Sequence, residues 1–423
     1  MLGLFCGLTM ASALVWSTPQ PVTDSFRQFY SVSNFAVNSL SMVYMFTYVL
    51  GLLPASYVLG NLGTRVTLLF GAAFTVLGAS IRAIPLPLQH PSFVPVAIGQ
   101  TLAGIGQCFT LGAPPQIAAI WFPPSERGKA TAVGTVANAL GSVLSFAIGP
   151  PLAQDIPMLL LTNSAVCSVV CLLILVLFRE RPPLPPTVAQ SQETFELRDF
   201  FSLLKDTQFM LLAVGTGFAL GSFWAIPTML AQSIVPQGYS ETDAGILGMV
   251  LIGAGLVGSF AAGFLLDLLP LWHKFLIVTA GTSGLLAMIA YTLSMVPGGI
   301  IPLYVAVAVL GMSLSALIPL SMEAAAECAF PLPEPVTAGV LCAVANAGAL
   351  LLTAGMSLMQ NSTTGDTVMS NWFATIVLGI SVALLVVWRF DRKRSTREAS
   401  IRSGIVRSTS RLESMGNPDL DLD

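Results

Sequence analysis

Long, almost uninterrupted runs of apolar residues make up most of the chain, and short polar segments separate them. The runs are close to the roughly 20 residues that an α-helix needs to cross the hydrocarbon core of a bilayer. They do not alternate apolar and polar positions as the strands of a membrane β-barrel do. The pattern therefore predicts an all-α membrane protein with twelve transmembrane helices. The predicted spans are 1–18, 36–60, 66–84, 93–120, 129–152, 156–178, 207–232, 243–268, 274–296, 300–329, 336–359 and 371–390.

The first apolar run could also be interpreted as a secretory signal peptide, because Ala11-Ser12-Ala13 resembles a small-residue cleavage site. A signal peptide begins with a positively charged region, and no basic residue precedes this run. We therefore interpret residues 1–18 as the first transmembrane span.

Composition excludes several classes of protein. The chain has 423 residues, of which 54% are hydrophobic and only 9% charged, whereas about a quarter of a soluble domain is charged. The six cysteines lie in apolar runs without metal-ligand spacing, and the two histidines lie in predicted loops. The sequence has no nucleophile–base pair, metal cluster or phosphate-binding loop of an enzyme. We expect no cofactor, no metal, no disulfide framework and no nucleic-acid partner.

A polar segment, 179–206, divides the spans into two sets of six. It predicts an N-terminal six-helix half (1–178), a cytoplasmic linker (179–206), a C-terminal six-helix half (207–390) and a disordered cytoplasmic tail (391–423). Two six-helix halves in pseudo-symmetric arrangement resemble the major facilitator fold.

The basic residues predict the orientation. If the linker is cytoplasmic, only Arg27 and Arg82 of the 18 lysines and arginines fall on the outer side, so both termini are predicted to be cytoplasmic. We expect the plasma membrane, with a vacuolar or lysosomal membrane as the alternative. Asn361-Ser362-Thr363 is the one glycosylation sequon, and it falls in the last predicted outer loop.

Two segments resemble the charged latch that closes the inner face of major facilitator proteins. In the second half, Gly263 is followed by Asp267 and then by Lys274. In the first half, Gly60 stands where the acidic residue is expected, and Arg65 follows it. We expect Asp267 and Arg65 to contribute to gating.

Two acidic residues, Glu323 and Glu327, lie four positions apart in the tenth predicted span and so share one helix face. Acidic residues within a span are costly and are usually functional or paired. Two interpretations remain open. They latch the inner gate against Arg127 or Lys129, or they neutralise a cation in transit.

Trp16 and Trp224 lie inside predicted spans, whereas the other four tryptophans lie at span ends, where indole rings commonly anchor at the lipid headgroups. An indole face attracts a cation electrostatically. In a chain with so little charge, the pair indicates a site for an organic cation. The alternative is that both rings are further membrane anchors.

Several segments together resemble the feline leukaemia virus subgroup C receptor-related family of solute carriers. The segments are Phe29-Tyr30-Ser31-Val32-Ser33, Leu40 to Met45, Gly99-Gln100 with Gln107, Trp121-Phe122-Pro123, Asn138-Ala139-Leu140-Gly141, and Met322 to Pro331. The family includes choline and ethanolamine transporters and proteins assigned to haem export. The resemblance covers all twelve predicted spans.

The resemblance implies that Trp16 and Trp224 flank a quaternary ammonium group and that two amides complete the site. Gln107 matches the first amide, and Asn346 stands where the family has a glutamine that is one methylene longer.

We therefore expect a monomeric, alternating-access transporter of a small choline-like cation in the lipid bilayer. The first and fourth spans contain no acidic residue and no span contains a histidine to relay protons, so we expect uniport. The alternatives are transport of haem, a porphyrin or a vitamin-like metabolite, and a non-transporting receptor.

Overall fold

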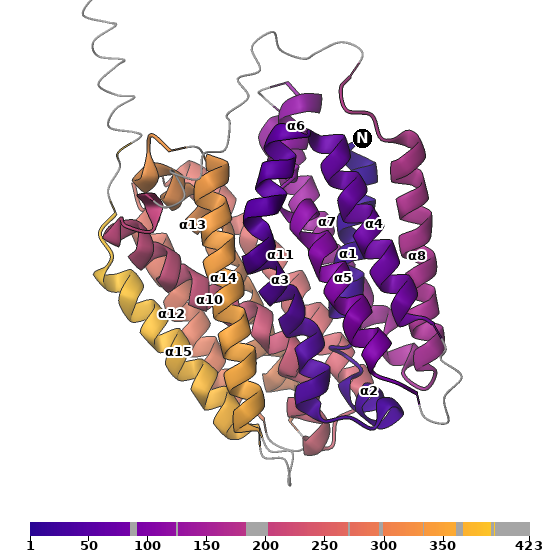
Figure 1. The fold of residues 1–423 in the computed structure, drawn as a ribbon. Coiled ribbons are helices and arrows are strands. Elements are labelled where there is room, and N and C mark those ends of the chain that lie inside the picture. Colours follow the sequence, from indigo (N-terminus) through magenta and orange to yellow (C-terminus); the bar gives the residue numbers. More distant parts are fainter. Residues whose placement is uncertain are drawn as a thin grey trace, which may run out of the picture.

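The computed structural model describes residues 1–84, 91–123, 126–182, 202–269, 271–295, 299–332, 334–360, 367–390 and 393. These residues form fourteen α-helices and two short 3-10 helices, and none of them is in a strand (Figure 1). Eleven of the helices are long and apolar enough to cross a membrane. The first predicted span corresponds to α1, a shorter apolar helix of 16 residues.

The first eight helices belong to the amino-terminal part of the chain. They are α1 (Leu2–Ser17), α2 (Thr23–Tyr30), α3 (Asn34–Asn61), α4 (Thr64–Arg82), α5 (Val94–Leu111), α6 (Pro114–Trp121), α7 (Arg127–Ile148) and α8 (Ile156–Leu177), with η1 (Pro150–Leu152) between the last two. The others are α10 (Thr207–Ile234), η2 (Val235–Gln237), α11 (Glu241–Leu268), α12 (His273–Leu293), α13 (Ile300–Ala329), α14 (Glu334–Met359) and α15 (Val368–Val387).

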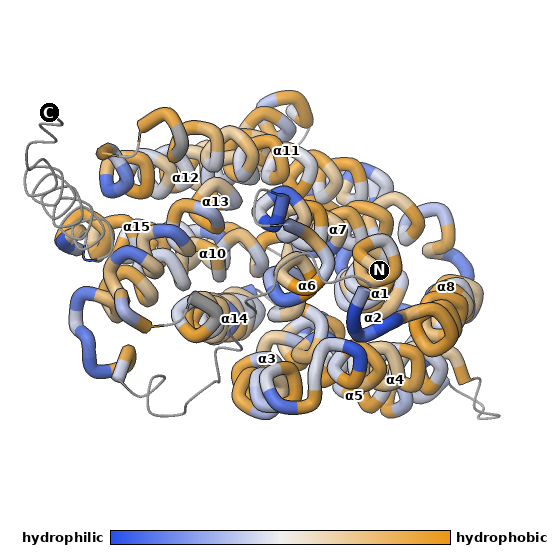
Figure 2. The backbone as a smooth tube through the Cα atoms, turned by 90° about the horizontal axis from the view of Figure 1, so that it is seen from above, coloured by the Kyte–Doolittle hydropathy of each residue, from blue (hydrophilic) through white to orange (hydrophobic). Residues whose placement is uncertain are grey.

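The all-α fold is confirmed, eleven of the predicted spans contain a helix long and apolar enough to cross a membrane, and the structure differs from the prediction in two places. The predicted span 93–120 is two helices, α5 and α6, because Pro114 and Pro115 begin a new helix rather than continue the old one. The segment after Pro19, between the first two predicted spans, contains the short helix α2. That helix is the hydrophilic exception among otherwise apolar helices (Figure 2), and it ends at Ser31 in a left-handed conformation with φ 53°.

Helices α1 to α8 pack mainly against one another, and so do α10 to α15 (Figures 1 and 2). The main contacts between the two groups are those of α3 with α14 and of α7 with α11. The exact domain boundaries stay a prediction. Residues 183–201 of the predicted linker, the tail apart from Lys393, and the sequon at Asn361 lie outside the described residues.

The bundle has two ends. We call the end that carries Met1 and α6 the terminal face, and the opposite end, which carries α2 and η2, the α2 face (Figure 1). Helices α1, α7 and α10 run from the terminal face to the α2 face, and α5 runs the other way.

Glycines allow several helix pairs to approach at backbone distance. A Cβ atom at Gly141 of α7 would lie 2.2 Å from the backbone oxygen of Met10 in α1. In the second group, a Cβ atom at Gly311 of α13 would lie 2.1 Å from the oxygen of Leu251 in α11. These contacts require glycine, since real Cβ atoms do not approach a backbone oxygen so closely.

Candidate functional site

Trp16 lies in the last turn of α1, and its ring is partly buried. It packs against a cluster of buried residues that includes Val15 of α1, Tyr44 of α3 and Ala103 of α5. The indole Nε1 is buried and has no hydrogen-bond partner among the described residues. The ring is therefore held by packing.

Gln107 lies on α5, the helix that also contacts the end of α1. The Gln100 side chain donates to the backbone oxygens of Val15 and Trp16, both at 3.4 Å. Gln107 is seven residues further along α5, about 10 Å nearer the terminal face at 1.5 Å per residue. It is 9% exposed, and its side chain makes no hydrogen bond within the described part of the chain.

The C-terminal half contains a similar arrangement on α10 and α14. These helices pack closely where Gly217 of α10 faces Val344 and where Gly221 faces Gly348. Asn346 lies at the depth between these two contacts, 8% exposed, and its amide donates to the Cys342 oxygen at 2.8 Å. Trp224 lies three residues beyond Gly221, nearer the α2 face, and is partly buried.

The four predicted binding residues thus fall into two pairs of similar geometry. In each pair a tryptophan lies nearer the α2 face, and a neutral amide lies one to two helical turns nearer the terminal face. Among the described residues no hydrogen bond joins one of the four side chains to another. That they line a single site stays a prediction.

The sequence analysis missed Tyr48. This residue of α3 is 3% exposed and packs against Cys108, the neighbour of Gln107. Cys342, which lies one turn from Asn346, packs against the same cluster. Tyr48 therefore connects the two amide-bearing helices. A second polar aromatic residue one turn after Tyr44 was the signal available.

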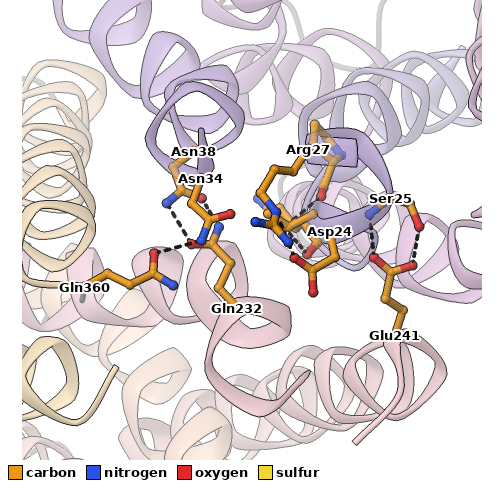
Figure 3. Close-up of polar contacts among 11 residues, drawn as sticks. Asp24, Ser25, Arg27, Asn34, Asn38, Gln232, Glu241 and Gln360 are labelled. Carbon is orange, nitrogen blue, oxygen red and sulfur yellow. Dashed lines mark hydrogen bonds and ion pairs between the residues drawn. The ribbon is translucent and has the colours of Figure 1, made fainter. Parts of the chain in front are cut away.

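A network of uncharged side chains joins the two halves at the α2 face (Figure 3). Asn38 of α3 exchanges hydrogen bonds with Gln232 of α10 in both directions. Its amide also donates to Ser357 Oγ of α14 at 2.8 Å and to Met229 Sδ of α10 at 3.3 Å. Asn38 and Gln232 are 1% and 2% exposed, so these bonds form away from water.

Two further contacts cross between the halves at the same face (Figure 3). The Glu241 carboxylate, in the first turn of α11, accepts from the backbone N–H of Ser25 at 3.0 Å and from its hydroxyl at 2.6 Å. Asn34 donates to Gln360 at 3.3 Å. We call all these cross-half contacts the α2-face gate. The sequence analysis missed it, since its residues are mostly neutral and distant in sequence.

At the terminal face, the Glu180 carboxylate lies at the start of α4. It accepts from the backbone N–H groups of Thr64, at 2.9 Å, and Arg65, and so caps the start of α4. Gly63 precedes the helix with φ +88°, and a Cβ atom there would lie 2.7 Å from a Glu180 oxygen. The Arg65 side chain itself is exposed.

The other predicted gating residues lie at the same face. Glu327 is 7% exposed, while Glu323 is exposed, although both stand on α13. The Arg127 guanidinium donates to the Phe122 oxygen at 3.3 Å. Asp267 belongs to α11, and its side chain lies outside the described atoms. Their gating roles stay predictions.

Replacement of Glu180 by alanine is expected to destabilise the protein. A carboxylate at a helix start satisfies unpaired N–H groups and interacts with the helix dipole, and the loss is about 1 kcal/mol. Thermal unfolding of the detergent-purified protein should show a lower Tm. Glu126→Ala is the matched control, since Glu126 caps α7 without a side-chain hydrogen bond. Equal melting of the two variants would contradict the capping role.

The described residues contain no group of three or more histidine, cysteine or acidic side chains that could hold a metal ion.

Comparison with known proteins identifies the family. The family model of the major facilitator superfamily matches residues 4–356. An uncharacterised transporter of the major facilitator type from Caenorhabditis elegans is 30% identical over 434 residues, covering 98% of this chain and 72% of the worm protein. The choline/ethanolamine transporter FLVCR1 of Felis catus is 29% identical, and the match covers 96% of this chain and 75% of the cat protein.

Solved structures agree on the fold. A bacterial homologue of the human lysosomal transporter Spinster superposes with a TM-score of 0.73 at 13% identity, covering 91% of this chain and 95% of the other. A D-xylose–proton symporter superposes with a TM-score of 0.71 at 15% identity, covering 93% and 97%.

The family match extends over most of the chain, and the relatives and structural neighbours are transporters rather than enzymes. The apolar helices agree with a multi-pass protein of the membrane. The chain therefore belongs to the major facilitator superfamily and, within it, to the feline leukaemia virus subgroup C receptor-related family of membrane transporters.

Proposed function

We propose that the protein carries a small organic cation of the choline or ethanolamine type across the membrane by alternating access. The observation that carries the proposal is the matched placement of Trp16 and Trp224, each with a neutral amide nearer the terminal face. No acidic residue stands in the described segments of α1, α5 or α10. A cation would therefore be held by indole faces and amide oxygens rather than by an ion pair.

The relatives support the same substrate class. Choline/ethanolamine transporters of Felis catus and Homo sapiens are 29% and 28% identical over 96% and 92% of this chain. Asn346 is shorter than glutamine, which leaves room for a bulkier head group than choline.

Competition uptake tests the cation directly. Cells that express the protein should accumulate radiolabelled choline saturably, and unlabelled choline and ethanolamine should compete. The neutral isostere 3,3-dimethylbutan-1-ol has the shape of choline without its charge and should not compete. Equal competition by the isostere would reject a cation site. Uptake equal to vector cells would reject choline, and other amines, pyridoxine-like vitamins and haem would be the next substrates tried.

We infer that transport is uniport driven by the membrane potential. We also infer that the protein resides in the plasma membrane with its terminal face on the cytoplasmic side. In proteoliposomes, an inside-negative potassium diffusion potential should accelerate uptake, and a pH gradient alone should not. Acceleration by the pH gradient would instead indicate proton coupling.

Alternating access requires that the α2-face gate open and close. Its contacts are hydrogen bonds between mostly uncharged groups, each worth about 0.5–1.5 kcal/mol net, so the closed state can exchange with an open one. The closed α2 face corresponds to a carrier that opens toward the terminal face. In the proposed orientation, this is the inward-open side.

Replacement of Asn38 by leucine is expected to shift the protein toward opening at the α2 face. The change removes the bonds to Gln232, Ser357 and Met229 at similar side-chain volume. Spin labels at the exposed Gln28 and the half-buried Gln237 should report a larger fraction of long distances by pulsed electron paramagnetic resonance. Ser39→Ala is the control, since the Ser39 hydroxyl bonds only Ala36 in its own helix. An unchanged distance distribution in Asn38→Leu would contradict the gate.

A further inference from the structure

The end of α1 lacks a backbone donor at one position. In an α-helix the oxygen of Val15 accepts from the N–H of residue 19, which is Pro19 and has no N–H. Thr18 has helical dihedral angles, φ −50° and ψ −44°. The nitrogen of Pro19 therefore occupies the position from which an N–H would donate to the Val15 oxygen. The next oxygen, of Trp16, is also without its usual donor, because the N–H of Gln20 bonds Ser17 instead.

Two side chains from other helices take the place of the missing donors. Arg82, the last residue of α4, donates Nη1 to the Val15 oxygen at 2.9 Å. Gln100 of α5 donates to the oxygens of both Val15 and Trp16. The two residues join the last turn of α1, including Trp16, to α4 and α5. We call these contacts the α1 clamp.

The clamp is built into the packing of α4 and α5. A Cβ atom at Gly99 would lie 2.4 Å from the Gly78 oxygen and 2.6 Å from Cγ of Arg82. The two glycines therefore bring the helices together and make room for the Arg82 stem. Arg82 is 2% exposed and Gln100 is fully buried.

Burial of the Arg82 guanidinium costs folding free energy that its single hydrogen bond does not explain. Its Nε and Nη2 are buried and have no hydrogen-bond partner among the described residues. The titratable groups that act on it are Tyr44, Cys167 and Tyr30, and phenols and thiols are neutral at pH 7. Burial raises the pKa of Tyr30 to about 12, which keeps that phenol neutral. A buried charge without an opposite charge is destabilising, so its presence indicates a role other than stability.

We propose that Arg82 and Gln100 are positioning residues that replace the N–H missing at Pro19 and hold Trp16 in its substrate-binding orientation. The proposal rests on the proposed function, in which Trp16 contacts the substrate. Because α5 also carries Gln107, the clamp fixes the separation between the indole and the amide within the N-terminal half. Arg82 acts through the backbone of α1 and does not itself touch the substrate.

The test combines Arg82→Met with Pro19→Ala, which restores a backbone N–H at the position of the lost donor. In choline uptake, Arg82→Met should raise KM about tenfold, the order of one lost cation–π contact, with Vmax nearly unchanged. The double variant should return KM to within about threefold of wild type, and Pro19→Ala alone should have little effect, because the restored N–H replaces the donor. Arg27→Met is the matched control, since Arg27 pairs with Asp24 within α2.

Hydrogen–deuterium exchange of peptides that cover residues 12–22 gives a readout that needs no substrate. Exchange should be faster in Arg82→Met than in wild type and should slow again in the double variant. If wild type does not take up choline, the proposed function fails, and exchange still decides the clamp.

Four results would overturn the proposal. The first is a rise in KM that Pro19→Ala does not reverse. The second is a fall in Vmax with KM unchanged, which indicates a role in conformational change. The third is exchange that Arg82→Met leaves unaltered. If Arg82→Met does not fold, failure of the double variant to restore folding would also reject the clamp.

Discussion

Trp16→Ala and Trp224→Ala should each abolish saturable uptake of choline while the protein still reaches the cell surface. Each change removes the indole face that would hold the cation, worth up to about 2 kcal/mol or roughly 30-fold in affinity for a desolvated site. Phenylalanine at either position keeps a weaker aromatic face and should retain a reduced uptake. The measurement is initial-rate uptake against concentration, normalised to surface expression.

Trp272→Ala and Trp372→Ala are the matched controls for these variants. Both rings are exposed, at 53% and 37%, and lie at helix ends, where indole rings anchor at headgroups. They should transport as wild type does. If all four variants lose uptake equally, the loss reflects insertion or folding, and Trp16 and Trp224 would have no special role.

Gly141→Ala should produce a larger loss of stability than Glu180→Ala. The added Cβ would lie 2.2 Å from the Met10 oxygen, and neither backbone can move without separating α1 from α7. Overpacking at a close helix contact costs about 1–3 kcal/mol. Size-exclusion chromatography of heated, detergent-solubilised protein should show a lower midpoint of aggregation and a lower folded yield.

Gly253→Ala in α11 is the control, since nothing lies within 4 Å of a Cβ atom at that position. It should leave stability unchanged or raise it slightly, because alanine favours a helix over glycine. Similar melting of Gly141→Ala and wild type would mean that α1 and α7 are further apart than the structure has them.

The sequence predicts the spans well because the bilayer imposes one length and one polarity on every crossing helix. Helix breaks and short polar helices do not depend on the length and polarity that the bilayer imposes. The break between α5 and α6 depends on Pro114 and Pro115, which interrupt a segment that remains apolar throughout. Helix α2 is eight residues long and hydrophilic, so hydropathy could not reveal it.

The candidate site was predictable only in part. The placement of Trp16 and Trp224 inside predicted spans indicated an aromatic pair, and the family resemblance added Gln107 and Asn346. The partners of Asn38 and Glu180 could not be predicted, because they are 194 and 116 residues away in sequence and carry no local pattern. Arg82 was expected on the outer side as a topological charge, but its side chain is buried against α1. Such contacts depend on how the helices pack against one another, and this packing cannot be derived from a single sequence.

The chemistry of the α2-face gate bears on the compartments in which this carrier could operate. The contacts around Asn38 use amide, hydroxyl and thioether groups, none of which gains or loses a proton in the physiological range. Their strength is therefore the same at a neutral cell surface and in an acidic lumen, and added salt screens them little. The part of the gate around Asn38 would therefore hold equally well in a neutral and in an acidic compartment, whereas the Glu241–Ser25 contact involves an ionisable carboxylate.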